Sequence, residues 1–270
     1  MSGSDRDADN IIAFAPERRE RLRRIVQSRR AVRVEELRSE LGVSVATVRR
    51  DLDELEQTGA LRRVHGGAVS MDVRPIESRF EAKAAEQATQ KRRIAGRALG
   101  LIKLGETIYI DGGSTCLELA RLLVARDDLT IVTSSLPAIV ELAGGGPRLV
   151  VIGGELRPLS QALVGPLTLP LLDELFVDRA FMGTFGLSLE AGLTTSDPAE
   201  AFTKERVLSR AREVVLLVDR SKLGTRSFAH AGHLEQIDIV VTDQDLGEEA
   251  SIVFEDAAVR VMVAAQGGSR

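Results

Sequence analysis

One stretch of eleven residues, 42–52, constrains the fold of this chain most strongly, because it predicts a tight turn followed by a helix with one apolar face. Ser44 suits the N-cap position, since its hydroxyl can accept a hydrogen bond from a free backbone N–H of the first turn. Val48, Leu52 and Leu55 then recur at i, i+4 and i+7, which places them on one side of the helix. We expect this side to pack against a core.

The opposite side and flanks of the same helix are small, hydroxyl-bearing and cationic, and they consist of Ala46, Thr47, Arg49 and Arg50. A recognition helix presents such a surface to the major groove of DNA, with its N-terminal residues nearest the base edges. The alternative is that Arg49 and Arg50 are solvated charges on an ordinary three-helix unit.

The neighbouring segments favour the DNA-binding interpretation. Residues 16–29 and 34–41 predict two more helices, and Gly42 can adopt the positive φ that a tight turn between helices often needs. Gly59 stops the recognition helix. Residues 60–69 then form two short extended pieces around a basic tip, so the whole unit is predicted to be a winged helix-turn-helix.

The distribution of charge separates this unit from the rest of the chain. The 270 residues carry a net charge of −4. Residues 16–69, however, hold 13 Arg, no Lys and 9 acidic residues, so this segment is +4 and the remainder is −8. Positive charge is therefore concentrated where contact with phosphates is expected, and an acidic module follows.

Several function classes are disfavoured by composition. There is one cysteine, Cys116, so an intrachain disulfide is excluded and a reducing compartment is expected. The N-terminus carries no apolar signal-like stretch, and no run of about 18 apolar residues occurs. We therefore expect a cytoplasmic protein without membrane contact.

The remainder of the chain alternates between apolar runs rich in Val and Ile and helix-like segments. The runs, which predict strands buried on both faces, are 107–110, 129–132, 149–152, 180–182, 214–218, 237–241 and 259–263. The helical segments between several of them include 116–124, 137–143, 199–211 and 246–254. This alternation predicts an α/β domain with a mostly parallel sheet.

The predicted domain organisation has four parts. Residues 1–15 are expected to be a disordered tail, 16–70 the winged helix-turn-helix, and 71–90 a linker that becomes helical near Ala82. Residues 91–265 form the α/β domain, which we expect to bind an effector.

Small, hydroxylated or charged residues follow five of the predicted strands, at the rim where parallel sheets bind ligands. The loop 111–115, Asp-Gly-Gly-Ser-Thr, combines glycines that allow close approach, two hydroxyls and the start of a helix, which together predict an anion site. Taken singly, each loop could be a plain strand-to-helix connection. Together, such a rim suits a phosphorylated polyol.

The sequence LGVSVATVRRDLDELEQTGALRRVHGGA closely resembles the DeoR family of transcriptional regulators, and the resemblance extends over residues 16–263. It implies a sensor domain with a fold similar to ribose-5-phosphate isomerase and CoA-transferases, in a repressor of carbohydrate-metabolism genes that responds to a phosphorylated sugar. We expect the double-stranded DNA operator to be contacted by Ser44, Ala46, Thr47, Arg49, Arg50, Arg62, Arg63 and His65. His65 could equally cap the wing hairpin.

The resemblance also implies which residues hold the effector. They are Asp111, Gly113, Ser114 and Thr115 around the phosphate, Thr133, Ser134 and Ser135 beside it, Gly153 and Gly154 in the lining, and Lys222 as a cation. It further places Glu200 and Lys204 where the family often has an acidic residue and a lysine. The chain departs from the common family pattern at Gly112, Ser114 and Cys116, and has Ser134 where Asn is usual, which bears on the identity of the sugar.

Other interpretations remain open at this point. Asp111, Asp219 and Lys222 could serve proton transfer in a sugar-phosphate isomerase with an appended DNA-binding unit. The C-terminal domain could instead only dimerise. We expect a homo-oligomer, because regulators of this type read two half-sites. We expect no cofactor and no metal, since the His230 and His233 pair lacks further ligands at helical spacing.

The arginine-rich first helix leaves one more alternative. Its arginines, at positions 18, 19, 21, 23 and 24, could form a solvated face or contact the DNA backbone.

Overall fold

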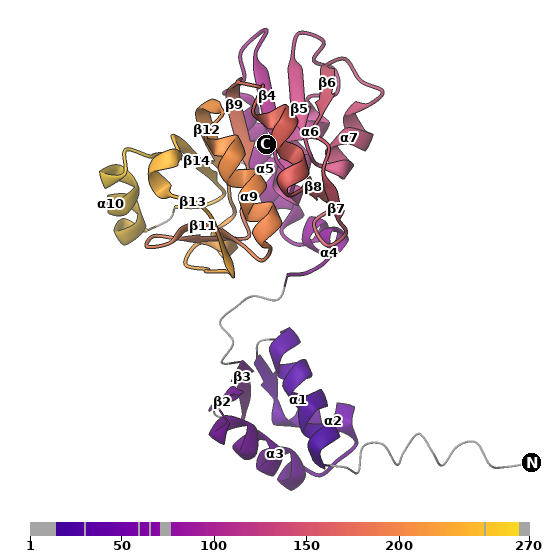
Figure 1. The fold of residues 1–270 in the computed structure, drawn as a ribbon. Coiled ribbons are helices and arrows are strands. Elements are labelled where there is room, and N and C mark those ends of the chain that lie inside the picture. Colours follow the sequence, from indigo (N-terminus) through magenta and orange to yellow (C-terminus); the bar gives the residue numbers. More distant parts are fainter. Residues whose placement is uncertain are drawn as a thin grey trace, which may run out of the picture. The chain divides into compact units, whose positions relative to one another are not determined.

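The computed structural model describes residues 15–29, 31–58, 60–64, 66–70, 77–245 and 247–264 (Figure 1). The chain divides into two compact units, residues 1–76 and 77–270. The predicted tail up to residue 14 and residues 71–76 of the predicted linker lie outside the described residues, and Ala15 begins the first helix.

The described part of the first unit consists of α1 (Ala15–Arg29), β1 (Ala31–Arg33), α2 (Val34–Leu41), α3 (Val45–Gln57), β2 (Leu61–Val64) and β3 (Gly67–Ser70). The apolar stripes of the three helices meet in one core, in which Leu22, Leu37 and Leu52 are fully buried. Gly42 ends α2 in the left-handed conformation with φ 66°, as the tight turn to α3 requires.

The wing is a three-stranded antiparallel sheet with the order β1-β3-β2. The hairpin of β2 and β3 was expected from the sequence, but β1 was not. Three residues between two helices are too few to show a strand period, and β1 is a strand because Ala31, Val32 and Arg33 pair with Val69, Ala68 and Gly67.

The second unit begins with helices and then alternates strands with helices. Its elements are α4 (Phe80–Ala85), α5 (Ala88–Leu99), β4 (Thr107–Ile110), α6 (Ser114–Leu122), β5 (Thr130–Thr133), α7 (Leu136–Leu142), β6 (Arg148–Val151), β7 (Glu155–Arg157), β8 (Ala162–Val164), α8 (Leu169–Leu172), β9 (Val177–Met182), β10 (Gly186–Ser188), β11 (Gly192–Thr195), α9 (Pro198–Leu208), β12 (Ala211–Leu217), β13 (Ala229–Gly232), β14 (Ile239–Thr242), α10 (Glu248–Asp256) and β15 (Arg260–Val263). Short 3₁₀ turns occur at Pro166–Thr168, Arg220–Lys222 and Leu234–Gln236.

The seven predicted strands all lie in one parallel sheet with the order β15-β14-β12-β9-β4-β5-β6. Each begins or ends within a few residues of the predicted run. The prediction of a winged helix-turn-helix followed by a mostly parallel α/β domain is therefore confirmed.

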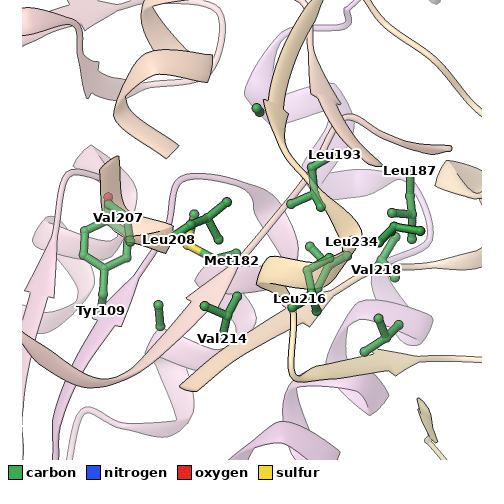
Figure 2. Close-up of a cluster of buried hydrophobic side chains, with 14 of the residues drawn as sticks. Tyr109, Met182, Leu187, Leu193, Val207, Leu208, Val214, Leu216, Val218 and Leu234 are labelled. Atoms are coloured by element: carbon green, nitrogen blue, oxygen red, sulfur yellow. The ribbon is translucent and has the colours of Figure 1, made fainter. Parts of the chain in front are cut away.

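The five inner strands of this sheet are largely buried on both faces, as their apolar runs indicated, whereas the edge strands β6 and β15 are exposed or half-buried. Along β4, Tyr109 belongs to one core cluster while its neighbours Ile108 and Ile110 belong to the other. Figure 2 shows the first cluster, in which Tyr109, Met182 and the α9 residues Val207 and Leu208 converge. The second cluster is covered by α5, α6 and α7.

The chain reverses its direction of travel across the sheet between β4 and β9. Strands β5 and β6 follow β4 in the sequence and lie on one side of it. Strand β9 lies on the other side of β4, and β12, β14 and β15 continue the sheet from there. The carboxyl ends of β4 and β9 consequently flank a topological switch point, which is where open parallel sheets form a crevice.

Part of the predicted linker is helical, and α4 lies where a helix near Ala82 was expected. Residues 77–90 include α4 and the start of α5, and they belong to the second compact unit. Short polar and alanine-rich segments show little periodicity of apolar residues. For this reason their sequence resembles that of a linker. None of the helices in the described residues has the length and apolarity needed to cross a membrane.

Candidate functional site

Helix α3 has the two-sided character that its sequence predicted. The Ser44 hydroxyl accepts a hydrogen bond from the Thr47 backbone N–H at 3.1 Å, so Ser44 is the N-cap. Val48 and Leu52 are fully buried. Arg49 and Arg50 are exposed, and neither has an ion-pair partner among the described residues. Two guanidinium groups are thereby left available on the outer side of the helix.

The first turn of α3 also leaves small and hydroxyl-bearing groups at the surface. Ala46 is exposed and Thr47 is half-buried. The Thr47 hydroxyl lies 2.9 Å from the Ser44 hydroxyl. Small side chains here let a partner approach the helix closely.

The two arginines of the wing have different surroundings. Arg62 on β2 is exposed. Arg63 forms an ion pair with Asp53 of α3, and its backbone N–H donates to Glu56 Oε1 at 2.7 Å. Arg63 therefore ties the wing to α3, whereas Arg62 faces solvent. His65 lies outside the described residues.

Two arginines of α1 form ion pairs with α3, inside the first unit. Arg18 donates two hydrogen bonds to Asp51 of α3, at 2.6 and 3.0 Å, and both side chains are almost fully buried. Arg19 pairs with Glu54, also on α3. These two pairs fix α1 against the recognition helix.

A pocket lies at the switch point of the sheet, at the carboxyl ends of β4, β9 and β12. Its lining comprises Glu77, Lys83, Lys91, Gly112, Gly113, Ser114, Thr115, Cys116, Ser160, Gly183, Thr184, Phe185, Glu200, Lys204, Leu217, Val218, Asp219 and Lys222. It thus combines the N-terminus of α6, four serine and threonine side chains, and four lysines. This is a donor-rich surface suited to an anion.

Lys204 on α9 is the most deeply placed of these lysines. Its ammonium forms an ion pair with Asp111, donates to the Gly183 carbonyl at 3.0 Å and lies 3.7 Å from Glu200. Burial lowers the pKa of Lys204, but the charges of Asp111 and Glu200 outweigh it and raise the pKa above its usual value. Asp111 also accepts a hydrogen bond from the Gly183 N–H at 2.9 Å, so this pair joins β4, β9 and α9.

Two further lysines come from the helices that precede the sheet. Lys83 on α4 pairs with Glu77 at 2.7 Å. Lys91 on α5 is buried, and its ammonium donates to the carbonyls of Lys83 and Glu86. Burial lowers the pKa of Lys91. Neither lysine was predicted to belong to the site.

Lys222 follows β12 and sits over an aromatic ring. Its ammonium lies 5.7 Å from the centroid of the Phe185 ring, and the Lys83 ammonium lies 6.0 Å from the same ring. Phe185 thus lies within cation–π distance of two pocket lysines.

Ser160 supplies the clearest sign of an incoming polar group. The residue is 5% exposed, and its hydroxyl oxygen has no hydrogen-bond partner among the described residues. A buried hydroxyl without a partner costs free energy. Because Ser160 lines the pocket, a ligand group there would satisfy it.

The structure brings together part of the predicted effector site. Gly113, Ser114, Thr115 and Lys222 line the pocket, and Asp111 lies behind it as the partner of Lys204. Gly113 has φ 124° and Gly112 packs so tightly that a Cβ would lie 3.1 Å from that of Ala162. Glycine is therefore needed at this turn.

The loop after β5 has structural contacts and does not contribute to the lining of this pocket. Thr133 donates to the Ile110 carbonyl at 2.6 Å, Ser134 bonds the Tyr109 hydroxyl at 2.9 Å, and Ser135 is the N-cap of α7. All three are buried. Their role toward an effector stays a prediction.

The loop after β6 lies at the end of the sheet and is likewise absent from the lining. Gly153 is exposed, and a Cβ at Gly154 would lie 2.9 Å from the Val164 carbonyl oxygen. Gly154 is therefore required by its own packing.

Comparison with known proteins identifies both units. Residues 18–74 match the family described as the DeoR-like helix-turn-helix domain, and residues 86–244 match the DeoR C terminal sensor domain. The HTH-type transcriptional regulator GlpR of Haloferax volcanii is 37% identical over 246 residues, covering 91% of this chain and 96% of that protein. The lactose phosphotransferase system repressor of Staphylococcus epidermidis is 35% identical, covering 85% and 92%.

Among solved structures, ribose 5-phosphate isomerase A of Methanocaldococcus jannaschii is 25% identical, with a TM-score of 0.39, covering 51% of this chain and 55% of that one. This is a partial likeness, whereas the two family matches and the relatives extend over nearly the whole chain. The chain therefore belongs to the DeoR family of transcriptional regulators, with a DeoR-like helix-turn-helix domain followed by a DeoR sensor domain.

Proposed function

We propose that this regulator represses genes of carbohydrate metabolism and that a phosphorylated sugar, bound in the pocket at the β4 and β9 switch point, controls its binding to DNA. The single observation that carries the proposal is the pocket itself. It joins a helix N-terminus, four lysines and the buried hydroxyl of Ser160, which has no hydrogen-bond partner in the described part of the chain. The name of the related lactose phosphotransferase system repressor agrees with control by carbohydrate.

In this proposal the phosphate group lies at the start of α6. The backbone N–H groups and hydroxyls of Ser114 and Thr115 surround it, next to the ammonium of Lys222. Ser160 is left to bond a hydroxyl of the sugar. Lys204 and Asp111 hold the floor of the pocket and contact each other.

The proposed role is binding rather than turnover, and the surroundings of the candidate acid–base groups support this. The Asp111 carboxylate is engaged by Lys204 and the Gly183 N–H. The Asp219 carboxylate accepts from the Ser221 backbone N–H at 2.9 Å. A general base needs a carboxylate that is free to reach its substrate.

For DNA, we propose that Ser44, Ala46, Thr47, Arg49 and Arg50 face the major groove and that Arg62 contacts the phosphate backbone. Arg63 assists by holding the wing on α3, and His65 is proposed as a wing contact. A palindromic operator would be read by a homo-oligomer in the cytoplasm. The oligomeric state is measured by light scattering at several protein concentrations.

Arg50→Ala tests the DNA surface. We expect operator binding to be lost, because Arg50 is exposed on the outer side of α3, while the melting temperature stays unchanged. Arg212→Ala is the matched control, since Arg212 is an exposed arginine of the sensor domain. Equal operator affinity of the two variants at one salt concentration removes Arg50 from the interface.

The function is tested by measuring the affinity of the full chain for the DNA upstream of its own gene, with and without a panel of phosphorylated sugars at fixed salt. A change in affinity with one compound supports the proposal and identifies the effector. Tight binding of DNA that no sugar phosphate alters contradicts the proposed role of the pocket.

A further inference from the structure

Glu77 lies at the boundary between the two compact units in the sequence and belongs to the pocket of the second unit. It is the first residue of the second compact unit, and its side chain lines the pocket although only 4% of it is exposed. In the sequence it directly follows residue 76, at which the first compact unit ends. Glu200 and Asp219, the other acidic residues of the lining, come from α9 and from the turn after β12.

Glu77 is held by three donors from different parts of the sensor domain. Its carboxylate accepts from Lys83 of α4 at 2.7 Å, from Arg157 of β7 at 2.6 Å, and from the hydroxyl of Ser196 before α9. Arg157 also pairs with Glu200 at 3.2 Å. Two charged donors and one hydroxyl thus hold the buried Glu77 carboxylate in place. We call Glu77 and these three donors the clamp.

Lys83 is shared between this clamp and the pocket. Its ammonium pairs with Glu77, and the residue lines the pocket next to Phe185 and Ser114. The backbone of α4 is fixed as well, because the Lys83 carbonyl accepts from Lys91 and from the Ser114 hydroxyl at 3.4 Å. Because Lys83 and Ser114 line the same pocket, a phosphate bound there can pair with the Lys83 ammonium.

We propose that Glu77 is an internal anion which occupies Lys83 when the pocket is empty, and that a bound phosphate displaces it and so loosens α4, the first helix of the sensor domain. This inference rests on the proposed function, of which it names the regulation. The phosphate takes the Lys83 ammonium and places a like charge beside the Glu77 carboxylate, which weakens the clamp. The coupling is reciprocal, so whatever strengthens the clamp weakens the binding of phosphate.

The test uses the full chain and inorganic phosphate as the probe. Isothermal titration calorimetry gives the affinity, and hydrogen–deuterium exchange reports on the backbone of Phe80–Ala85. We expect phosphate to raise exchange in this segment of the unmodified protein. In Glu77→Gln, exchange should be raised without phosphate, and phosphate should bind about tenfold more tightly because its internal competitor is gone.

Further variants distinguish competition between Glu77 and phosphate for Lys83 from a purely structural role of Glu77. If Glu77 only supported the fold, Glu77→Gln would weaken phosphate binding. In a Lys83→Gln background, Glu77→Gln should no longer improve binding, since the competition is for that ammonium. Glu81→Gln is the matched control on α4, because Glu81 is exposed, bonds Gln161 and does not belong to the lining; its phosphate affinity should stay within about twofold.

If Glu77→Gln does not fold, Ser196→Ala replaces it in the test. It removes one neutral donor from the clamp and should tighten phosphate binding about two- to threefold. Phosphate affinity that is unchanged or lower in both variants overturns the displacement and leaves the proposed function standing. No phosphate binding to any form of the protein overturns the assignment of the pocket and, with it, this inference.

Discussion

At the residue scale, arginines that look equivalent in the sequence have different roles in the structure. Arg18 is buried against Asp51, whereas Arg24 is exposed and pairs with Glu20. The run of arginines on α1 was open to two interpretations, a solvated face or contacts with DNA. Arg18 fits neither, because it binds the inner side of the recognition helix. Its partner Asp51 sits on α3 one residue after Arg50, which faces outward.

Replacing Arg18 or Arg24 by alanine should change the free energy of unfolding by different amounts. Arg18→Ala leaves the Asp51 carboxylate buried without its partner, so we expect the free energy of unfolding of the first unit to fall by about 3 kcal/mol. Arg24→Ala should change it by less than about 0.5 kcal/mol. Urea unfolding followed by circular dichroism measures both, and equal effects would contradict the buried pair.

Ser160 offers a residue-scale test of the pocket. Its hydroxyl makes no hydrogen bond among the described residues, so Ser160→Ala should leave the free energy of unfolding within about 0.5 kcal/mol. The affinity for the effector found in the panel should fall about five- to tenfold, because the ligand loses one hydrogen bond. Thr184→Ser, which keeps a hydroxyl in the lining, is the control. A destabilised variant with unchanged affinity would show that Ser160 is structural.

At the scale of elements, strands made of apolar runs were predictable, and short strands of mixed composition were not. The seven strands of the main sheet contain apolar runs, most of them rich in Val and Ile, and α3 has a clear 3.6-residue period. The hairpin β7-β8 and the sheet β10-β11-β13 consist of strands of three or four residues. Such strands carry little period of their own, and their pairing partners come from distant parts of the chain.

The wing contains a glycine whose environment gives an element-scale prediction. A Cβ at Gly67 would collide with the Val32 carbonyl oxygen of the neighbouring strand β1. Gly67→Ala should therefore cost about 1–3 kcal/mol in stability and weaken operator binding through the wing. Gly96→Ala in α5 is the control, because its Cβ meets nothing within 4 Å and should stabilise the helix by about 0.5–1 kcal/mol. Thermal unfolding should give a lower melting temperature for Gly67→Ala and a higher one for Gly96→Ala than for the unmodified protein.

At the scale of the whole molecule, the buried clamp should affect stability in acid. Burial raises the pKa of Glu77, but hydrogen bonds from Arg157 and Lys83 outweigh it and lower the pKa from about 4.5 to about 2. The charged carboxylate therefore contributes stability above pH 4.5, on the order of 3 kcal/mol, and this is lost as the pH falls towards 2.

Glu77→Gln isolates this contribution. The difference in free energy of unfolding between the unmodified chain and the variant should be constant from pH 7 to about 5 and should shrink below pH 4.5. Urea titrations at several pH values measure it. A difference that grows as the pH falls would mean that Glu77 is protonated in the folded protein.

The sequence by itself determined the elements, because their periods, caps and turns are local properties. It indicated the winged helix-turn-helix, the seven strands of the sheet and the turn at Gly113, Ser114 and Thr115 for which we propose anion binding. Only the tertiary structure decided which of the loops meet. The order of strands across the sheet sets β9 between β4 and β12, and this order depends on contacts between residues far apart in the chain. For the same reason, Lys83, Lys91 and Ser160 joined the pocket, while the loops after β5 and β6 did not.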